Sequence, residues 1–154
     1  MKKLETTGVL MTEIVLPSHT NALGTIFGGV VMSWIDIAGA IAATRHARSP
    51  VVTVSIDSLH FIVPIKTGYI VMIRAAVTFV GKTSMEVEIV VDAENSITGD
   101  TRKTTHAFLT YVAVDEFGRP KKVPPLPVPS TSAEKKRFEA ALKRHKLRLN
   151  RKSH

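Results

Sequence analysis

The stretch NALGTIFGGVVMSWIDIAGAIAATRHAR, residues 21–48, decides the fold of this 154-residue chain. Its apolar residues recur with helical spacing over a greater length than anywhere else in the sequence. The glycine pair Gly28-Gly29 precedes the repeat, and Ser49-Pro50 ends it, because proline disfavours helix at the residue before it. The sequence therefore predicts a turn that leads into one long helix.

The predicted helix has two unlike faces on a wheel of about 100° per residue. The expected core face is broad and bulky: Val30, Val31, Trp34, Ala38, Ile41 and Ala42. The opposite face places Asp36 among mainly small residues: Gly29, Met32, Ser33, Gly39, Ala40 and Ala43. Small residues allow a backbone or a ligand to approach closely, and burying an unpaired carboxylate is costly. Asp36 is therefore either a solvated surface group or a candidate catalytic carboxylate in a pocket.

The composition is that of an ordinary globular domain, with 44% hydrophobic and 22% charged residues. A chain of 154 residues is long enough for one domain with a real core. We expect a soluble, cytoplasmic protein, because the sequence has neither a signal-peptide-like apolar run nor a segment that could cross a bilayer. The lack of cysteine excludes disulfides and thiol chemistry.

The positive charge is concentrated at the C-terminal end of the chain. Residues 131–154 contain nine Lys or Arg and two Glu, which accounts for most of the net charge of +8. Aromatic residues, which typically alternate with basic ones in nucleic-acid-binding surfaces, are almost absent from this tail. We therefore expect no nucleic-acid partner and no insertion into a membrane.

Alternating apolar residues and turn signals predict five strands: residues 8–16, 51–63, 69–80, 84–92 and 103–114. Short links between the later strands predict antiparallel pairing. One helix against such a sheet gives an α+β domain. A partner subunit is the simplest cover for the small-residue helix face and the sheet edges. The expected organisation is a domain, a proline-rich linker and a basic helical tail that is loosely held or partly disordered: residues 1–117, 118–130 and 131–154.

Asp36 is the first candidate for chemistry, and three other features come next. Asn21 is either a turn residue or a site residue. The exposed N–H groups of Gly28 and Gly29 could bind an oxyanion or a phosphate, or the two glycines could only permit a tight entry turn. The basic hairpin Lys82-Thr83-Ser84 could bind a phosphate or simply be solvated. The histidines show no metal-ligand spacing, so we expect no metal.

Several motifs stand together in a recognisable order. The turn NALGTIFGG (21–29) is followed by MSWIDIAG (32–39), and further along by VSIDSLHF (54–61), Pro64, Gly68 and GKTS (81–84). This combination resembles the hotdog-fold acyl-CoA thioesterases over about residues 8–116, in the acyl-CoA hydrolase branch. The resemblance implies a hotdog fold, in which an antiparallel sheet wraps a long central helix, and the residues after it add the expected basic C-terminal helical tail.

The resemblance also implies roles for individual residues in hydrolysis of acyl-CoA to a carboxylic acid and CoA. Asp36 would be the general base or the nucleophile, and the N–H of Gly28, in a turn shaped by Gly29, would form the oxyanion hole. Asn21 would orient the thioester or the water and would come from a different subunit than Asp36. The family precedent is a homodimer with shared sites, which can assemble further as a hexameric trimer of dimers.

Substrate contacts are implied at Lys82, Thr83 and Ser84 for the CoA phosphates, and at Ser58 and His60 in the 54–61 stretch. No cofactor is implied, since coenzyme A belongs to the substrate. Three residues depart from the family pattern: His19, Thr25 and Tyr69. The alternative function is a non-catalytic acyl-CoA-binding regulatory module on the same fold, and the presence of Asp36 argues against it.

Overall fold

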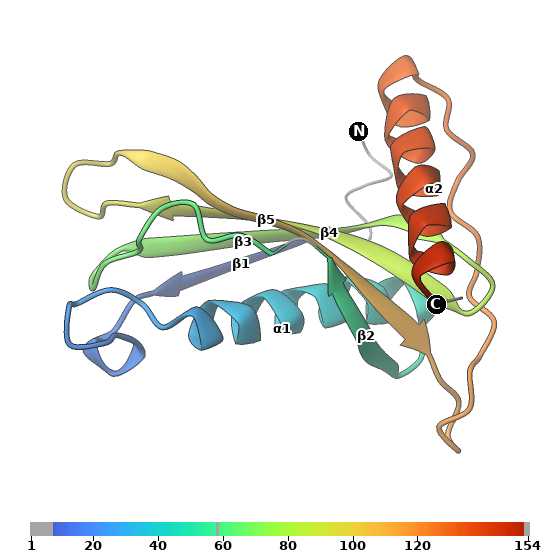
Figure 1. The fold of residues 1–154 in the computed structure, drawn as a ribbon, viewed down its shortest axis with the longest axis horizontal. Helices are drawn as coiled ribbons and strands as arrows, with labels where there is room; N and C mark the ends of the chain where they lie inside the picture. Colours follow the sequence, from blue (N-terminus) through green and yellow to red (C-terminus); the bar gives the residue numbers. More distant parts are fainter. Residues whose placement is uncertain (1–7, 58, 153–154) are drawn as a thin grey trace.

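The computed structural model describes residues 8–57 and 59–152. The chain forms one five-stranded antiparallel sheet, a long helix on one face of the sheet, and a second helix on the other side (Figure 1). The elements in chain order are β1 (Val9–Ile14), the short 3-10 helix η1 (Pro17–His19), α1 (Gly28–Ala47), β2 (Val51–Asp57), β3 (Ile70–Val80), β4 (Ser84–Glu94), β5 (Thr101–Ala113) and α2 (Ser132–Lys152). The predicted α+β architecture, with one long helix against an antiparallel sheet, is confirmed.

The strand order in the sheet is β1-β3-β4-β5-β2. β3, β4 and β5 pair as the short links between them predict. β2 does not pair with its sequence neighbour β3: it pairs with β5, from Val51↔Ala113 to Asp57↔Phe108. The connection from β2 to β3 is long, so it crosses the sheet and leaves β2 as an edge strand.

The core lies between α1 and the sheet. Eight residues of α1 are buried against the strands: Val31, Trp34, Ile35, Ala38, Gly39, Ala42, Ala43 and Ala47. The buried face therefore differs from the predicted one: Ile41 is exposed on the surface, whereas Gly39 and Ala43 are in the core. The reason is that α1 is apolar around most of its circumference, so the wheel alone does not identify the face that the sheet covers.

The basic tail is not loosely held, contrary to our expectation. α2 packs on the side of the sheet opposite α1 (Figure 1), and Ala141 is fully buried there. Arg144 forms two hydrogen bonds, of 2.8 and 2.9 Å, with the carboxylate of Glu86 on β4. Arg148 bridges Glu86 at 2.7 Å and Asp57 at 3.1 Å. These ion pairs bind the tail to the sheet because the Glu86 side chain is completely buried.

Candidate functional site

Asp36 lies half-buried in the middle of α1, and two side chains from other elements donate hydrogen bonds to it. Thr53 Oγ1, from β2, donates to Oδ1 at 2.7 Å. Tyr111 Oη, from β5, lies 2.9 Å from the same oxygen and 3.0 Å from the main-chain carbonyl oxygen of Asp36. No described residue donates a hydrogen bond to Oδ2. One carboxylate oxygen is therefore fixed in place, and the other is open to a water molecule or a substrate.

Tyr111 remains a hydrogen-bond donor at every physiological pH. Burial and the adjacent negative charge of Asp36 raise the pKa of the Tyr111 hydroxyl far above its ordinary value of 10. The neutral phenol can therefore stabilise the Asp36 carboxylate without competing with it for a proton. A neutral donor of this kind positions a catalytic carboxylate while leaving its charge intact.

Gly39 creates the space that Tyr111 occupies. A Cβ atom added at Gly39 would overlap the hydroxyl oxygen of Tyr111 and approach its ring carbons to about 3 Å. The ring can cross beneath the helix and reach Asp36 because this position has no side chain. The small residue at 39 therefore has a packing role within one chain, rather than being part of an exposed small-residue face.

Thr53 lies at an irregular point of the edge strand β2. The pairing register with β5 shifts between Thr53 and Ser55, so Val54 has no partner opposite it. Bulges bend a strand and change the direction of a side chain, and they are common beside active sites. Here the irregularity occurs at the residue whose hydroxyl reaches Asp36.

The start of α1 is open to solvent. Gly28 is the first helical residue, and Gly28 and Gly29 are both exposed. The N–H groups of Gly28 and Gly29, in the first turn, have no partner within the helix, so they are available to an anion. The ring of Phe61 lies beside this turn, 3.3 Å from the place where a Gly28 Cβ would be.

Asn21 is bound within its own turn and not to Asp36. Its Oδ1 accepts hydrogen bonds from the N–H groups of Leu23 and Thr25, and its Nδ2 donates to Thr25 Oγ1 at 2.8 Å. Thr25, one of the departures from the family pattern, thus fixes the orientation of the Asn21 side chain. Asp36 lies ~12 Å further along the helix axis than Gly28, so one chain does not bring the two parts of the predicted site together.

The predicted substrate contacts are dispersed. Lys82, Thr83 and Ser84 form the β3–β4 hairpin, in which the Lys82 and Thr83 carbonyls accept hydrogen bonds from Val123 and Ala113. His60 is exposed, and Ser58 lies outside the described residues. Within residues 8–57 and 59–152, no three His, Asp or Glu side chains gather in a way that could bind a metal ion. In the same part of the chain, neither helix is long and apolar enough to cross a membrane.

Sequence reasoning missed Thr53 and Tyr111. Thr53 looks like the polar half of an alternating strand, and nothing near it in the sequence points to Asp36. Tyr111 offered a weak signal, since a tyrosine in an otherwise buried strand usually needs a hydrogen-bond partner for its hydroxyl. Both residues become visible as site residues only once β2 and β5 are paired beneath α1.

The sequence pattern of the Thioesterase superfamily matches residues 23–99, a range that includes Gly28, Asp36 and Thr53. The chain belongs to the thioesterase superfamily. Among relatives of this thioesterase, an uncharacterised acyl-CoA thioester hydrolase of Bacillus subtilis is 42% identical over 95% of this chain and 84% of its own length. The cytosolic acyl coenzyme A thioester hydrolase of mouse is 35% identical over 94% of this chain, which spans only 38% of that longer protein.

Solved structures are similar to this thioesterase over nearly its whole length. An apo-hexameric acyl-CoA thioesterase superimposes with a TM-score of 0.89 at 45% identity, over 96% of this chain and 94% of that one. An acyl-CoA hydrolase of Staphylococcus aureus, in complex with butyryl-CoA, CoA and CoA disulfide, has a TM-score of 0.87 at 36% identity, over 97% and 90%. Variants of the same Staphylococcus enzyme with an aspartate, an asparagine or a threonine changed to alanine have also been solved.

Proposed function

We propose that this thioesterase hydrolyses acyl-CoA thioesters to a carboxylic acid and CoA. The observation that carries the proposal is the half-buried Asp36 carboxylate, with Oδ1 bound by Thr53 and Tyr111 and Oδ2 open. A positioned carboxylate is the group that a thioester hydrolase needs, because a thiolate leaves readily and no strong acid is required. The relatives named as acyl-CoA thioester hydrolases supply the substrate class.

Asp36 acts through Oδ2 in this proposal. As a general base it takes a proton from water, whose oxygen attacks the thioester carbonyl carbon. As a nucleophile it attacks that carbon itself, the CoA thiolate leaves, and water then hydrolyses the acid anhydride. In either route Thr53 and Tyr111 keep the carboxylate in place. The aspartate, asparagine and threonine that were changed in the Staphylococcus enzyme have the same spacing along the chain as Asp36, Asn21 and Thr53, which supports these assignments.

The helix start supplies the oxyanion hole. The N–H of Gly28, in the turn that Gly29 also shapes, donates to the negatively charged oxygen of the tetrahedral intermediate. One preorganised donor of this kind contributes about 10²–10³ in rate. Asn21 orients the thioester or the attacking water, which requires its carboxamide to exchange one of its turn contacts for substrate.

Two subunits share each site. The outer side of α1 and the edge strand β2 expose apolar side chains that a monomer would leave in water: Met32, Ile37, Ile41, Val52 and Val54. An isologous dimer through this surface pairs each Asp36 with the Asn21–Gly28 turn of its partner and gives two equivalent sites. The hexameric relative supports an oligomer, and we propose that three such dimers assemble.

Other contacts with acyl-CoA follow from charge and exposure. The hairpin residues Lys82, Thr83 and Ser84 bind CoA phosphates, and Ser58 and His60 contact the substrate beyond the reacting carbon. The reaction uses no cofactor, because the carboxylate, the N–H donor and water complete it. The cytosolic mouse relative supports a cytoplasmic location.

The experiment is a panel of acyl-CoAs of increasing chain length, with release of free thiol as the readout. Wild type should turn over members of the panel, and Asp36→Asn should be at least about 10²-fold slower while retaining the fold by circular dichroism. A folded wild type that binds acyl-CoA without releasing thiol would instead establish the regulatory module. Single turnover in ¹⁸O water tests the anhydride route, since label enters the Asp36 carboxylate only if water attacks the aspartyl carbonyl carbon of an anhydride.

A further inference from the structure

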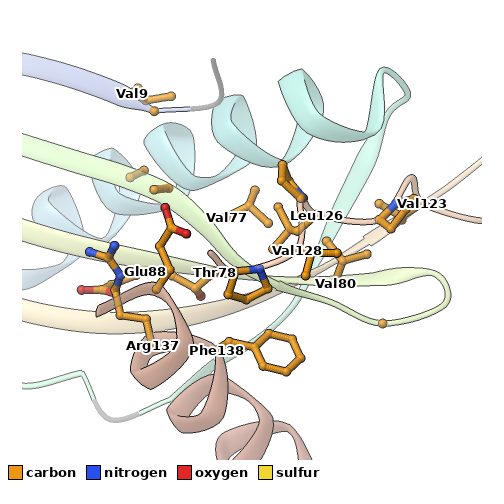
Figure 2. A pocket seen from close by; sticks show the side chains of 18 of the residues that line it. Val9, Val77, Thr78, Val80, Glu88, Val123, Leu126, Val128, Arg137 and Phe138 are labelled. Carbon is orange, nitrogen blue, oxygen red and sulfur yellow. The ribbon is translucent and has the colours of Figure 1, made fainter. Parts of the chain in front are cut away.

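A large cavity lies away from Asp36, between the sheet, the proline-rich segment and the start of α2 (Figure 2). Its volume is about 1260 Å³, and neither Asp36, Thr53 nor Tyr111 lines it. Of the described residues assigned to the proposed function, only Lys82 lines it. The reacting groups lie elsewhere, and the volume is more than sufficient for a small organic ligand.

The walls of the cavity are mainly apolar. β3 contributes Val77 and Val80, the proline-rich segment contributes Leu126 and Val128, and α2 contributes Phe138 (Figure 2). Val128 is 88% exposed and Phe138 41% exposed. Binding of an apolar chain here is favourable because it displaces water from these apolar side chains.

The backbone around the cavity explains why it stays open. β1 pairs with β3 only as far as Val9↔Ala75, so no described strand covers the edge of β3 beyond that pair. The facing segment includes Pro125, Pro127 and Pro129. Proline has no N–H group and a fixed φ angle, so this segment does not pair as a strand and close the space. The cavity is preformed, which lowers the cost of binding.

Cationic side chains that have no side-chain partner among the described residues stand around these apolar walls. Lys82, Lys122 and Arg137 line the cavity, and none of them forms an ion pair or a hydrogen bond with another described side chain. By contrast, the fourth cation, Arg74, is paired with Asp92 at 3.0 Å. Since Lys82 is already assigned to the CoA phosphates, Lys122 and Arg137 are the two positive charges left for a second ligand at this site.

The two carboxylates of the cavity are already engaged. Glu88 lies 3.2 Å from His106 Nε2. Glu134 accepts hydrogen bonds from the N–H groups of Ser130 and Thr131 at the start of α2, which lower the pKa of its carboxyl to about 2. These contacts hold the two carboxylates in place without removing their charge, but the described lining has four cationic side chains against these two, so its net charge is positive and favours an anionic group at one end of an apolar ligand.

We propose that this cavity binds a long-chain amphipathic anion, with the alkyl chain along Val80, Leu126 and Phe138 and the charged head at Lys122 and Arg137. The choice of ligand rests on the proposed function, since that reaction consumes and releases molecules of this chemistry. The ligand is either the free carboxylate product or the intact acyl-CoA. In both cases the protein has a second site, separate from Asp36, that binds the acyl chain.

Isothermal titration calorimetry on the assembled 154-residue protein tests the proposal, with octanoate, dodecanoate and neutral dodecanol as probes. Dodecanoate should bind saturably, more tightly than dodecanol, and more tightly than octanoate, by about fourfold per added methylene. Dodecanoyl-CoA and CoA alone are titrated into Asp36→Asn, so that turnover does not interfere. Because the active site of Asp36→Asn also binds the thioester, tight binding of dodecanoyl-CoA with none of dodecanoate identifies the intact thioester as the ligand of the cavity only if the cavity variants described below weaken it; binding that they leave unchanged would overturn the site.

Variants of the cavity localise the binding. The double variant Lys122→Gln with Arg137→Gln should bind the probe at least about 10-fold more weakly, and Val128→Trp should weaken it by filling the space. Lys143→Gln is the matched control, because Lys143 is exposed on α2 and does not line the cavity. If neither dodecanoate nor dodecanoyl-CoA binds, or if these variants do not change the binding, the proposal is overturned. A fall in oligomer mass for Val128→Trp would also overturn it, since the cavity would then be an interface between copies.

Thiol release by the same variants separates this proposal from the proposed function. The double variant should retain wild-type hydrolysis of short acyl-CoAs, because neither of its residues belongs to the proposed catalytic groups. If wild type binds dodecanoate at the cavity but hydrolyses no acyl-CoA, the proposed reaction is rejected and the proposed cavity site is retained. Hydrolysis without binding at the cavity would reject the site alone.

Discussion

The hydroxyl of Tyr111 lies 2.9 Å from the Oδ1 atom of Asp36 and 3.0 Å from the carbonyl oxygen of the same residue. A single side chain from β5 thus contacts both the carboxylate and the backbone of the helix that carries it. This contact fixes the rotamer of Asp36 relative to the sheet. It makes the position of the proposed catalytic oxygen depend on the pairing of β5 rather than on α1 alone.

Replacing Tyr111 with Phe should lower kcat about 10-fold with little change in KM. The variant removes one hydroxyl donor to a charged acceptor, an interaction typically worth about 1.5–3 kcal/mol, while Thr53 still donates to Oδ1. Steady-state kinetics with one acyl-CoA measure the effect, and circular dichroism checks the fold. Unchanged kcat in a folded Tyr111→Phe would show that Tyr111 does not position the carboxylate.

Thr53 offers a sharper comparison because one replacement removes the hydroxyl and another keeps it. Thr53→Val keeps the shape and β propensity but loses the donor, so its kcat should fall about 10-fold. Thr53→Ser keeps the donor and should stay within about threefold of wild type. Equal rates for the two variants would mean that packing at the edge of β2, rather than the 2.7 Å hydrogen bond, explains the role of Thr53.

Gly39→Ala should destabilise the protein, because its methyl group would overlap the Tyr111 hydroxyl. Overpacking of this kind costs about 1–3 kcal/mol, equivalent to a fall in Tm of several degrees. Gly29→Ala is the matched control for stability, since nothing lies within 4 Å of the Cβ it adds. Thermal unfolding followed by circular dichroism should show a loss only at position 39; a loss of similar size at both would refute the packing role.

The link between α2 and the sheet should depend on pH. Burial raises the pKa of Glu86, but the hydrogen bonds from Arg144, Thr78 and Arg148 outweigh it, so the pKa lies below 4.5. Because folding lowers the pKa of Glu86, this carboxylate stabilises the folded protein at every pH above its unfolded-state pKa. That stabilisation is lost as the pH falls below about 4.5 and then below the pKa of Glu86 in the folded state. Arg144→Met should therefore unfold more easily than wild type by about 3 kcal/mol at pH 7, and the difference should shrink at acidic pH.

Denaturant titrations at pH 7 and near pH 4 measure this difference in the free energy of unfolding. Lys146→Met is the control, because Lys146 is exposed on the same helix. Removal of residues 131–154 should likewise destabilise the domain, since it leaves the fully buried Glu86 without either arginine. A truncated protein as stable as the full chain would contradict this account of the tail.

Complementation between subunits tests the shared site. Asn21→Ala and Asp36→Ala homodimers should each be nearly inactive. After subunit exchange, about half the chains should be in heterodimers that have one intact site and one doubly defective site. Activity should therefore recover to about a quarter of the wild-type level, measured by thiol release. A verified heterodimer without recovery, or an active monomer, would show that each chain forms its own site.

The sequence by itself determined the local features of this protein. The helical repeat and its glycine and proline boundaries predicted α1, and alternation with short turns predicted β3, β4 and β5. Those signals depend on residues a few positions apart, where side-chain periodicity and backbone sterics act directly. Asp36 was also identified locally, as a lone carboxylate in an apolar helix, and the motif resemblance added Asn21 and Gly28.

Tertiary structure alone decided which residues meet. Thr53 and Tyr111 reach Asp36 because β2 pairs with β5 instead of β3, and the side of α1 that is buried was settled by where the sheet covers it. Arg144 reaches Glu86 because β4 turns that carboxylate to the outer face, where α2 packs. These contacts join residues far apart in the chain, and their free energy depends on strand register and burial, which no local pattern encodes.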